Sequence, residues 1–387
     1  MSKILIVNTY YYPNNIGGAE SVVQKLAEEL HRKEYEVAIY SSDGKEKMSK
    51  EQINGVLVYR GVEGRYVRQP AHNGKNPISV RIQNNINHRM NIFIKKELNF
   101  IITDFKPDII HTHNLYGLST QVWRYSKARN MSIVHTIHDY WLLNSSIYFW
   151  GKRNSKYPDY ITAPSKFVID KFKQKKYFEC KKYEVVPNGI EINISKIKEI
   201  VEEKLNRENK KIKFLYVGQL GEIKGINILL KEFSGWNNKN VELNICGQGN
   251  LDDLVLQYSK RDSRIHFWGQ VSKDKLDQIY NESDVLIAPS IWEEPFGMVA
   301  IEAYQHGLVV IAGKRGGLID IVENVEVGYL VEPTLEGELL KYMKLYTDRN
   351  KIKNEIKKIP EKIQIYSLNQ EVDGYCNIYE KILTKKE

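Results

Sequence analysis

An apolar run leads into a glycine-rich turn at positions 214–225, FLYVGQLGEIKG. The run 214–217 is typical of a buried strand, and the turn between Gly218 and Gly225 precedes a helical pattern. The same order of strand, turn and helix recurs along the chain. This alternation predicts the α/β class, with parallel strands covered by helices on both faces.

Short runs rich in β-branched and aromatic residues predict further strands on both sides of this stretch. They lie at 4–8, 36–41, 108–113, 132–138, 160–163, 241–246, 265–268, 285–288 and 309–312. Apolar residues at helical spacing predict a first helix over 20–31, and residues 363–383 are predicted to form a long C-terminal helix.

A break in this rhythm occurs at 185–190, which holds a Pro-Asn-Gly turn ending at Gly189. A Lys/Glu-rich stretch without strand character follows, up to about Lys211. We therefore expect a hinge near Gly189 and two doubly wound, Rossmann-like domains, 1–189 and 190–387. They are expected to face a cleft at the carboxyl ends of their strands, with the C-terminal helix as a segment able to cross back to the first domain.

The amino-acid composition is that of an ordinary globular protein. Of the 387 residues, 27% are charged and 42% are apolar, which excludes disordered and fibrous classes. No apolar stretch approaches the roughly 18–20 residues of a membrane span, and the start of the chain does not resemble a signal peptide. The three cysteines are far apart, as expected in a reducing cytoplasm. A net charge of +9 indicates an anionic partner.

A loop with paired glycines, Gly17 and Gly18, follows the first strand and precedes the first helix. Such glycines let backbone amides approach a ligand at a helix N-terminus, although a simple tight turn would need them equally. The spacing is neither GxGxxG nor that of a P-loop, so neither type of classical nucleotide site is predicted.

A histidine-rich strand end, HTIHDYW, occupies 135–141. We expect His138 at the carboxyl end of this strand, where an imidazole can bind a sugar hydroxyl or a phosphate oxygen. A metal site built from His111, His113 and His135 is an alternative, but no cysteine or carboxylate has the spacing to complete it.

A lysine in the first turn of the second domain, Lys224, is predicted to face the cleft. Its ammonium group would suit a diphosphate. The alternative is an ordinary solvated lysine in a loop.

The densest segment of polar and helix-starting residues is PSIWEEPFGMVAIEA at 289–303. A helix is expected to begin directly after a strand, so its first free amides form an anion site. The residues concerned are Phe296, Gly297, Met298 and Val299. Glu302, inside this helix, can accept hydrogen bonds from ribose hydroxyls, and Glu294 precedes it by eight positions in the loop. The alternative is a capping glutamate followed by a surface glutamate.

This segment resembles the EX7E motif of the retaining GT-B glycosyltransferases of family 4. Other motifs follow in the order of that family and cover almost the whole chain. They are 17–20 (the donor loop), 138–141 (the catalytic histidine), 163–165 and 186–190 (the inter-domain markers), 218–225 (the phosphate loop) and 316–318 (the late glycine pair).

The resemblance implies a GT-B fold and transfer of a sugar, with retention, from a UDP- or GDP-sugar to a glycan or lipid-linked acceptor. It implies bacterial surface polysaccharide synthesis, hexosyl transfer and no metal or cofactor. His138 and Glu294 would hold the donor sugar, Lys224 the diphosphate and Glu302 the ribose. Gly17, Gly18 and the amides at 297–299 would complete the donor site.

The chain departs from the family at Gln219, where an arginine is usual. This loss of charge leaves Lys224 and backbone amides to hold the leaving group, unless another base such as Arg315 compensates. Two other functions are alternatives. The first is a nucleotide-sugar epimerase, which could use the same fold. The second, a basic nucleic-acid-binding protein, is disfavoured because the positive charge is not gathered in a recognition motif.

Two basic stretches suggest where an acceptor could be met. Residues 60–96 contain eight Lys/Arg and one acid, with helical apolar spacing from Ile82, and 166–182 combine lysines with aromatic residues. Such stretches can lie on anionic lipid, which predicts a peripheral position on the inner face of the plasma membrane. The alternative is a solvated helix face.

Overall fold

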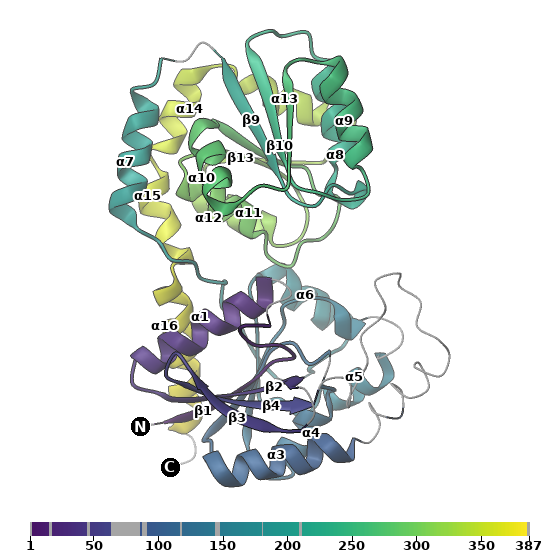
Figure 1. Ribbon diagram of the computed structural model, residues 1–387, viewed down its shortest axis with the longest axis vertical. Helices are drawn as coiled ribbons and strands as arrows, with labels where there is room; N and C mark the ends of the chain where they lie inside the picture. The colour runs from purple at the N-terminus through teal and green to yellow at the C-terminus, as the bar shows by residue number, and fades with distance from the viewer. Residues whose placement is uncertain are drawn as a thin grey trace. The chain divides into compact units, whose positions relative to one another are not determined.

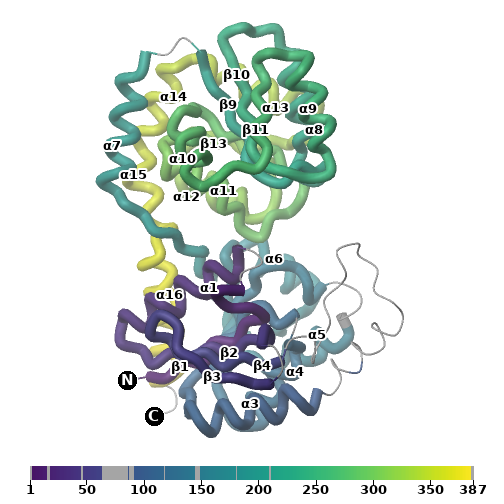
Figure 2. The backbone as a smooth tube through the Cα atoms, in the orientation of Figure 1, coloured from purple at the N-terminus to yellow at the C-terminus, as the bar shows by residue number. Residues whose placement is uncertain are grey.

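The computed structural model describes residues 2–14, 18–44, 47–62, 86, 91–116, 118–143, 148–179, 181–208 and 211–384. The chain forms two compact units, each an α/β sandwich (Figures 1 and 2). The first unit comprises residues 1–189 together with 368–387, and the second comprises 190–367.

The first unit is built on an eight-stranded sheet of order β3-β4-β2-β1-β5-β6-β7-β8. Its pairs are parallel except that β3 runs antiparallel to β4. Its strands are β1 (Lys3–Val7), β2 (Glu36–Gly44), β3 (Ser49–Ile53), β4 (Val56–Val62), β5 (Ile109–Thr112), β6 (Ser132–Thr136), β7 (Tyr160–Ala163) and β8 (Lys182–Val185).

Helices cover both faces of this sheet, because successive residues of the central strands are apolar and point to opposite faces. One face packs on α3 (Ile92–Phe105), α4 (Gln121–Lys127) and α6 (Lys166–Gln174), and α5 (Tyr148–Asn154) lies against α4. The other face packs on α1 (Gly18–Arg32) and α16 (Leu368–Leu383), and a short 3-10 turn, η1 (Trp141–Leu143), follows β6.

The second unit has a six-stranded parallel sheet of order β11-β10-β9-β12-β13-β14. Its strands are β9 (Ile212–Val217), β10 (Val241–Cys246), β11 (Ile265–Gly269), β12 (Val285–Ala288), β13 (Val309–Gly313) and β14 (Gly328–Val331). Its α-helices are α7 (Ile194–Leu205), α8 (Ile226–Ser234), α9 (Asp252–Arg261), α10 (Lys273–Glu282), α11 (Met298–Gln305), α12 (Leu318–Val325), α13 (Glu338–Leu345), α14 (Arg349–Ile356) and α15 (Ile359–Lys362), with 3-10 turns η2 (Glu222–Lys224) and η3 (Ile363–Tyr366).

The predicted α/β class with two Rossmann-like domains is confirmed. The sequence analysis did not predict the strands β3, β4, β8 and β14. The strand β3 has the sequence SKEQI and is largely exposed, so it carries no apolar run by which an edge strand could be recognised. The polar stretch after Gly189 contains the helix α7, whose few buried residues include Ile197 and Val201.

The end of the chain corrects the predicted domain range 190–387. The single helix expected over 363–383 is interrupted at Ser367, which has an extended backbone, and the second unit ends there. Residues 368–387 belong to the first unit because Val372, Tyr375 and Tyr379 are fully buried in its core beside α1.

Candidate functional site

Lys224 ends the short turn η2 that follows β9, at the carboxyl edge of the second sheet. The next residue, Gly225, has φ +73°, and a Cβ there would lie 2.0 Å from the carbonyl oxygen of Pro289. Only glycine allows this approach, which brings the Lys224 turn against the loop after β12. Across this contact the Lys224 ammonium forms an ion pair with Glu294 Oε1.

Glu294 is positioned by contacts within its own loop and by the loop after β13. Its Oε1 lies 3.2 Å from the hydroxyl of Ser290, and its backbone carbonyl accepts a 2.6 Å hydrogen bond from the amide of Gly317. A Cβ on Gly316 would lie 2.1 Å from the same carbonyl oxygen. Gly316 and Gly317 therefore let the loop after β13 pack directly against the backbone of Glu294. The side chains of Lys224 and Glu294 are 25% and 20% exposed, so the ion pair is accessible to a ligand.

The helix α11 starts beside this ion pair, as the sequence predicted. Gly297 precedes it with φ +112°, where a Cβ would lie 2.5 Å from Leu318 Cδ2. The first amides of a helix have no acceptor within the helix, so Met298 and Val299 present N–H groups suited to an anion. Phe296 is buried, with its ring edge-to-face with that of Tyr366, and it anchors the start of the helix.

Glu302 lies one turn inside α11, and its Oε2 accepts a 3.3 Å hydrogen bond from the hydroxyl of Tyr280. The Tyr280 ring stacks on that of His306, with 4.9 Å between centroids and planes 7° apart. Burial, followed by the charge of Glu302, raises the pKa of Tyr280 well above its ordinary value, so the phenol remains a donor. The sequence analysis missed Tyr280, which lies in no recognisable motif, and gave no role to Ser290, although Ser290 lies in the quoted segment 289–303.

A hollow of about 620 Å³ lies at the carboxyl ends of β9, β10 and β11. A Cβ on Gly247 would meet the carbonyl oxygen of Gly218 at 1.9 Å, so the close approach of these two turns requires glycine at position 247. The exposed Gln219 contributes to its lining, together with Gly218, Gly247, Gln248, Gly249, Asp252 and Gln270. Arg315, the base considered as a substitute for the missing charge at Gln219, is paired with Glu332 at 2.6 Å.

His138 lies just beyond β6 in the first unit, and its Nε2 is 2.8 Å from Nδ1 of His113, which follows the adjacent strand β5. Burial lowers the pKa of His138 to about 4, so the imidazole is neutral near pH 7. The next residue, Asp139, accepts a 2.9 Å hydrogen bond from the amide of Trp141, and burial raises its pKa to about 6.

The other two histidines of the considered metal site have protein partners. The ring nitrogens of His111 contact the hydroxyls of Tyr379 at 2.6 Å and Thr136 at 2.7 Å, and Nδ1 of His135 contacts the Thr112 hydroxyl at 3.0 Å. Within the described ranges, no group of three or more His, Cys, Asp or Glu residues has an arrangement that could hold a metal ion.

The predicted donor loop is seen only in part, because Gly17 lies outside the described residues, whereas Gly18 opens α1. The preceding backbone is fixed by a buried ion pair between Arg60 and Asp43, with 2.8 Å from Nη1 to each carboxylate oxygen. Arg60 also donates to the carbonyl of Tyr12, and Asp43 accepts from the amide of Tyr11.

The structure corrects part of the predicted membrane surface. Arg60 is buried in the ion pair just described, and residues 63–85 and 87–90 lie outside the described chain. In the stretch 166–182, the aromatic rings of Phe172, Tyr177 and Phe178 are fully buried in the core, so they cannot contact lipid. On α3, Phe93 and Phe100 are exposed. Among the described helices, none is long and apolar enough to cross a bilayer.

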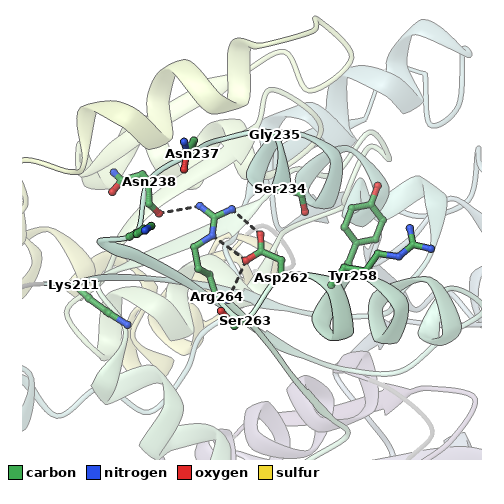
Figure 3. Close-up of a pocket in the computed structure, with 11 residues that line it drawn as sticks. Lys211, Ser234, Gly235, Asn237, Asn238, Tyr258, Asp262, Ser263 and Arg264 are labelled. Carbon is green, nitrogen blue, oxygen red and sulfur yellow. Dashed lines mark hydrogen bonds and ion pairs between the residues drawn. The ribbon is translucent and has the colours of Figure 1, made fainter.

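Figure 3 shows a second hollow, of about 710 Å³, at the amino ends of β9, β10 and β11. It contains none of the motif residues. Its central side chain, Arg264, pairs with Asp262 and donates to the carbonyls of Phe233, Trp236 and Asn238. The guanidinium thus joins the end of α8 to the start of β11.

Two family descriptions match the chain. Residues 16–194 match Glycosyltransferase Family 4, and residues 197–362 match Glycosyl transferases group 1. Together they span both units.

Individual proteins are also similar over most of their length. An uncharacterized glycosyltransferase of Methanocaldococcus jannaschii is 30% identical over 361 residues, covering 86% of this chain and 85% of the relative. An uncharacterized 42.6 kDa protein in the cps region of Klebsiella pneumoniae is 28% identical over 350 residues, covering 85% and 90%. The structure of Anabaena HepE in complex with UDP matches with a TM-score of 0.70 and 17% identity, covering 98% of this chain and 100% of that chain, which shows a shared fold.

Proposed function

Because the chain belongs to the group 1, or family 4, glycosyltransferases, we propose that it transfers a hexose from a nucleoside diphosphate sugar to a hydroxyl of a glycan or lipid-linked acceptor, with retention of configuration. The observation that carries this proposal is the accessible Lys224–Glu294 ion pair beside the N-terminus of α11. Together they offer a cation, a carboxylate and free amides at one edge of the second sheet.

The charges of this site match the demands of the reaction. Cleavage of a glycosyl–phosphate bond leaves negative charge on the diphosphate, which Lys224 and the amides of Met298 and Val299 would stabilise. These groups would supply the electrostatic role that a divalent cation has in other transferases, so we propose that the reaction needs no metal. Glu302, oriented by Tyr280, would accept hydrogen bonds from the ribose.

Glu294 would bind first Lys224 and then the donor sugar. In the structure it neutralises Lys224. When a diphosphate reaches that ammonium, the carboxylate can turn toward hydroxyls of the donor sugar, while Ser290 and Gly317 retain its loop. The neutral His138 in the first unit would bind the same sugar. The acceptor hydroxyl would attack from the side that the diphosphate leaves, which preserves the anomeric configuration.

The partners of the reaction are proposed from several observations. A fold shared with HepE, which was solved with UDP, supports a uridine diphosphate donor, with a guanosine diphosphate donor as the second choice. The Klebsiella relative from a cps region supports a role in surface polysaccharide synthesis. On α3, the exposed Phe93 and Phe100 and the lysines at 95 and 96 support a peripheral contact with an anionic membrane face, which would place the protein in the cytoplasm.

A donor screen tests this function. The full chain is incubated with UDP-, GDP- and ADP-sugars, with and without glycan or lipid-linked acceptors, in EDTA and then with added magnesium or manganese. We expect release of nucleoside diphosphate that increases with an acceptor and persists in EDTA. Conversion of the sugar to its epimer without an acceptor would instead show the epimerase, and loss of all transfer in EDTA would contradict the metal-free mechanism.

A further inference from the structure

Two histidines at neighbouring strand ends are joined ring to ring. We propose that His113 is a positioning residue whose Nδ1–H donates to Nε2 of His138, so that His138 carries its proton on Nδ1 and presents a hydrogen-bond donor to the substrate. This inference rests on the proposed function, which places His138 at the donor sugar.

The geometry shows that the two rings point at each other. The nitrogens are 2.8 Å apart, the ring centroids are 5.1 Å apart and the planes differ by 20°. The two nitrogens therefore lie between nearly coplanar rings, as in a direct hydrogen bond. Burial lowers the pKa of both imidazoles, to about 4 for His138, so a single proton lies between them near pH 7.

The surroundings of His113 decide which ring donates. Its other nitrogen, Nε2, is buried without a hydrogen-bond partner in the part of the chain that the structure describes. If His138 were the donor, His113 would carry its proton on this Nε2 and bury an unpaired N–H. Orphaned buried N–H groups are rare, which favours the proton on Nδ1 of His113.

The ring of His113 cannot easily rotate to another arrangement. It packs against His111 with 4.1 Å between centroids and lies edge-to-face with Tyr375. His111 is itself fixed on both nitrogens by the hydroxyls of Tyr379 and Thr136. The α16 helix, which carries both tyrosines, thus helps to hold the ring that orients His138.

This arrangement of protons determines the state of Nδ1 of His138. The described residues provide no partner for this atom, and His138 as a residue is only partly buried at the strand end. With its proton on Nδ1, His138 donates to an oxygen of the donor sugar, and with the opposite tautomer it could only accept. The buried contact between His113 and His138 therefore decides whether His138 donates a hydrogen bond to the substrate or accepts one.

Matched variants test the proposal by kinetics. His113→Asn places an amide N–H near the position of Nδ1, His113→Gln places one near Nε2, and His113→Leu removes both. We expect Asn to keep kcat within about threefold of the wild type, and Gln and Leu to lower kcat by about tenfold or more, roughly the worth of one oriented hydrogen bond. The affinity for UDP should not change, because the proposed nucleotide contacts lie in the second unit.

A direct readout of the proton uses the full chain labelled with ¹⁵N-histidine, with the His138 signals identified from their loss in His138→Gln. We expect an Nδ1–H tautomer for His138 in the wild type and in His113→Asn, and a mixture in His113→Leu. An Nε2–H tautomer in the wild type, or equal loss of kcat and thermal stability in all three variants, overturns the proposal. Inactivity of the wild type with every donor would refute the proposed function, while the spectrum would still decide the tautomer.

Discussion

Lys224 and Glu294 neutralise each other at the start of the candidate donor site. Each side chain is held from its own side, Lys224 by the turn that Gly225 permits and Glu294 by Ser290 and Gly317. The pair is therefore pre-organised, and a diphosphate would meet a cation that is already in place. Pre-organised charge of this kind is usually the largest single electrostatic contribution to a transition state.

Removal of the Lys224 ammonium should slow the chemical step. We expect Lys224→Ala to lower kcat by about 10²–10³-fold, because negative charge grows on the leaving diphosphate. Glu294→Gln should also lower kcat strongly but leave the affinity for free UDP nearly unchanged. Steady-state kinetics and calorimetry with UDP measure both effects.

Lys231→Ala serves as the matched control, because Lys231 lies on α8 of the same unit and pairs with Glu336 at the surface. It should behave as the wild type. Unchanged kcat in Lys224→Ala would show that this edge of the sheet is not the donor site.

The exposed Gln219 offers a test by gain of function. Gln219→Arg would add a guanidinium to the lining of the hollow at the carboxyl ends of β9, β10 and β11, at a position where the family usually has an arginine. We expect about two- to fivefold tighter binding of UDP, the range of an accessible ion pair, and a smaller gain at high salt. Calorimetry at two salt concentrations measures this, and weaker binding at both would contradict the expected position of the diphosphate.

At the scale of elements, the site depends on backbones that approach too closely for a side chain. The turns after β9, β12 and β13 meet at Gly225, Pro289, Glu294 and Gly316. Each turn alone is an ordinary connection between a strand and a helix. Their contact brings a lysine from one turn and a glutamate from another into one ion pair, at the carboxyl edge where parallel sheets bind ligands.

Two glycine-to-alanine variants distinguish the effect of a steric clash with a neighbouring loop from the effect of a left-handed backbone. Gly316 and Gly337 both have positive φ, +59° and +79°, but a Cβ at 316 would meet Glu294 at 2.1 Å, whereas a Cβ at 337 would meet nothing within 4 Å. Gly337→Ala should cost about 1–2 kcal/mol of stability, from its left-handed backbone, without affecting kcat. Gly316→Ala should cost more and should also lower kcat, because the Glu294 loop must move.

Thermal unfolding and steady-state kinetics on both proteins measure these effects. If Gly316→Ala kept the kcat of Gly337→Ala, the Gly316 contact would have no role in positioning Glu294.

At the scale of the molecule, the chain leaves the first unit after Gly189 and re-enters it at Leu368. The two crossing points are linked, since Glu371 on α16 accepts a 2.8 Å hydrogen bond from the amide of Gly189. This carboxyl group is buried, and burial raises its pKa to about 8. The core of the first unit thus combines a protonated carboxyl group with neutral histidines, and its stability must depend on pH.

Acidification should destabilise the first unit. Burial lowers the pKa of His138 to about 4 and of His135 to about 3, and the pKa values of His111 and His113 are also well below the ordinary 6.5. Between pH 6.5 and 4 the unfolded chain therefore binds protons that the folded unit does not, so stability falls as pH decreases through this window.

Glu371 acts in the opposite direction, because its raised pKa makes the folded unit retain a proton up to about pH 8, as does Asp139 up to about pH 6. Four histidines outweigh these two carboxyl groups, and we expect the free energy of unfolding to fall by about 2–4 kcal/mol from pH 7 to pH 5. Urea unfolding at the two pH values measures this fall. Glu371→Gln should make it steeper, and equal stability at both pH values would contradict the expectation.

Hydrophobic period and glycine-rich turns are local properties, so the sequence was enough to predict the class of fold and the division of the chain at Gly189. It also predicted that Lys224 and Glu294 lie in turns after strands and that Glu302 lies within a helix. Which side chains meet depends on contacts between segments that are far apart in the chain. The pairing of Lys224 with Glu294, of His113 with His138 and of Arg60 with Asp43 joins residues that are distant or unremarkable in sequence. The placement of residues 368–387 in the first unit also followed from burial, since an amphipathic helix does not specify which core its apolar face covers.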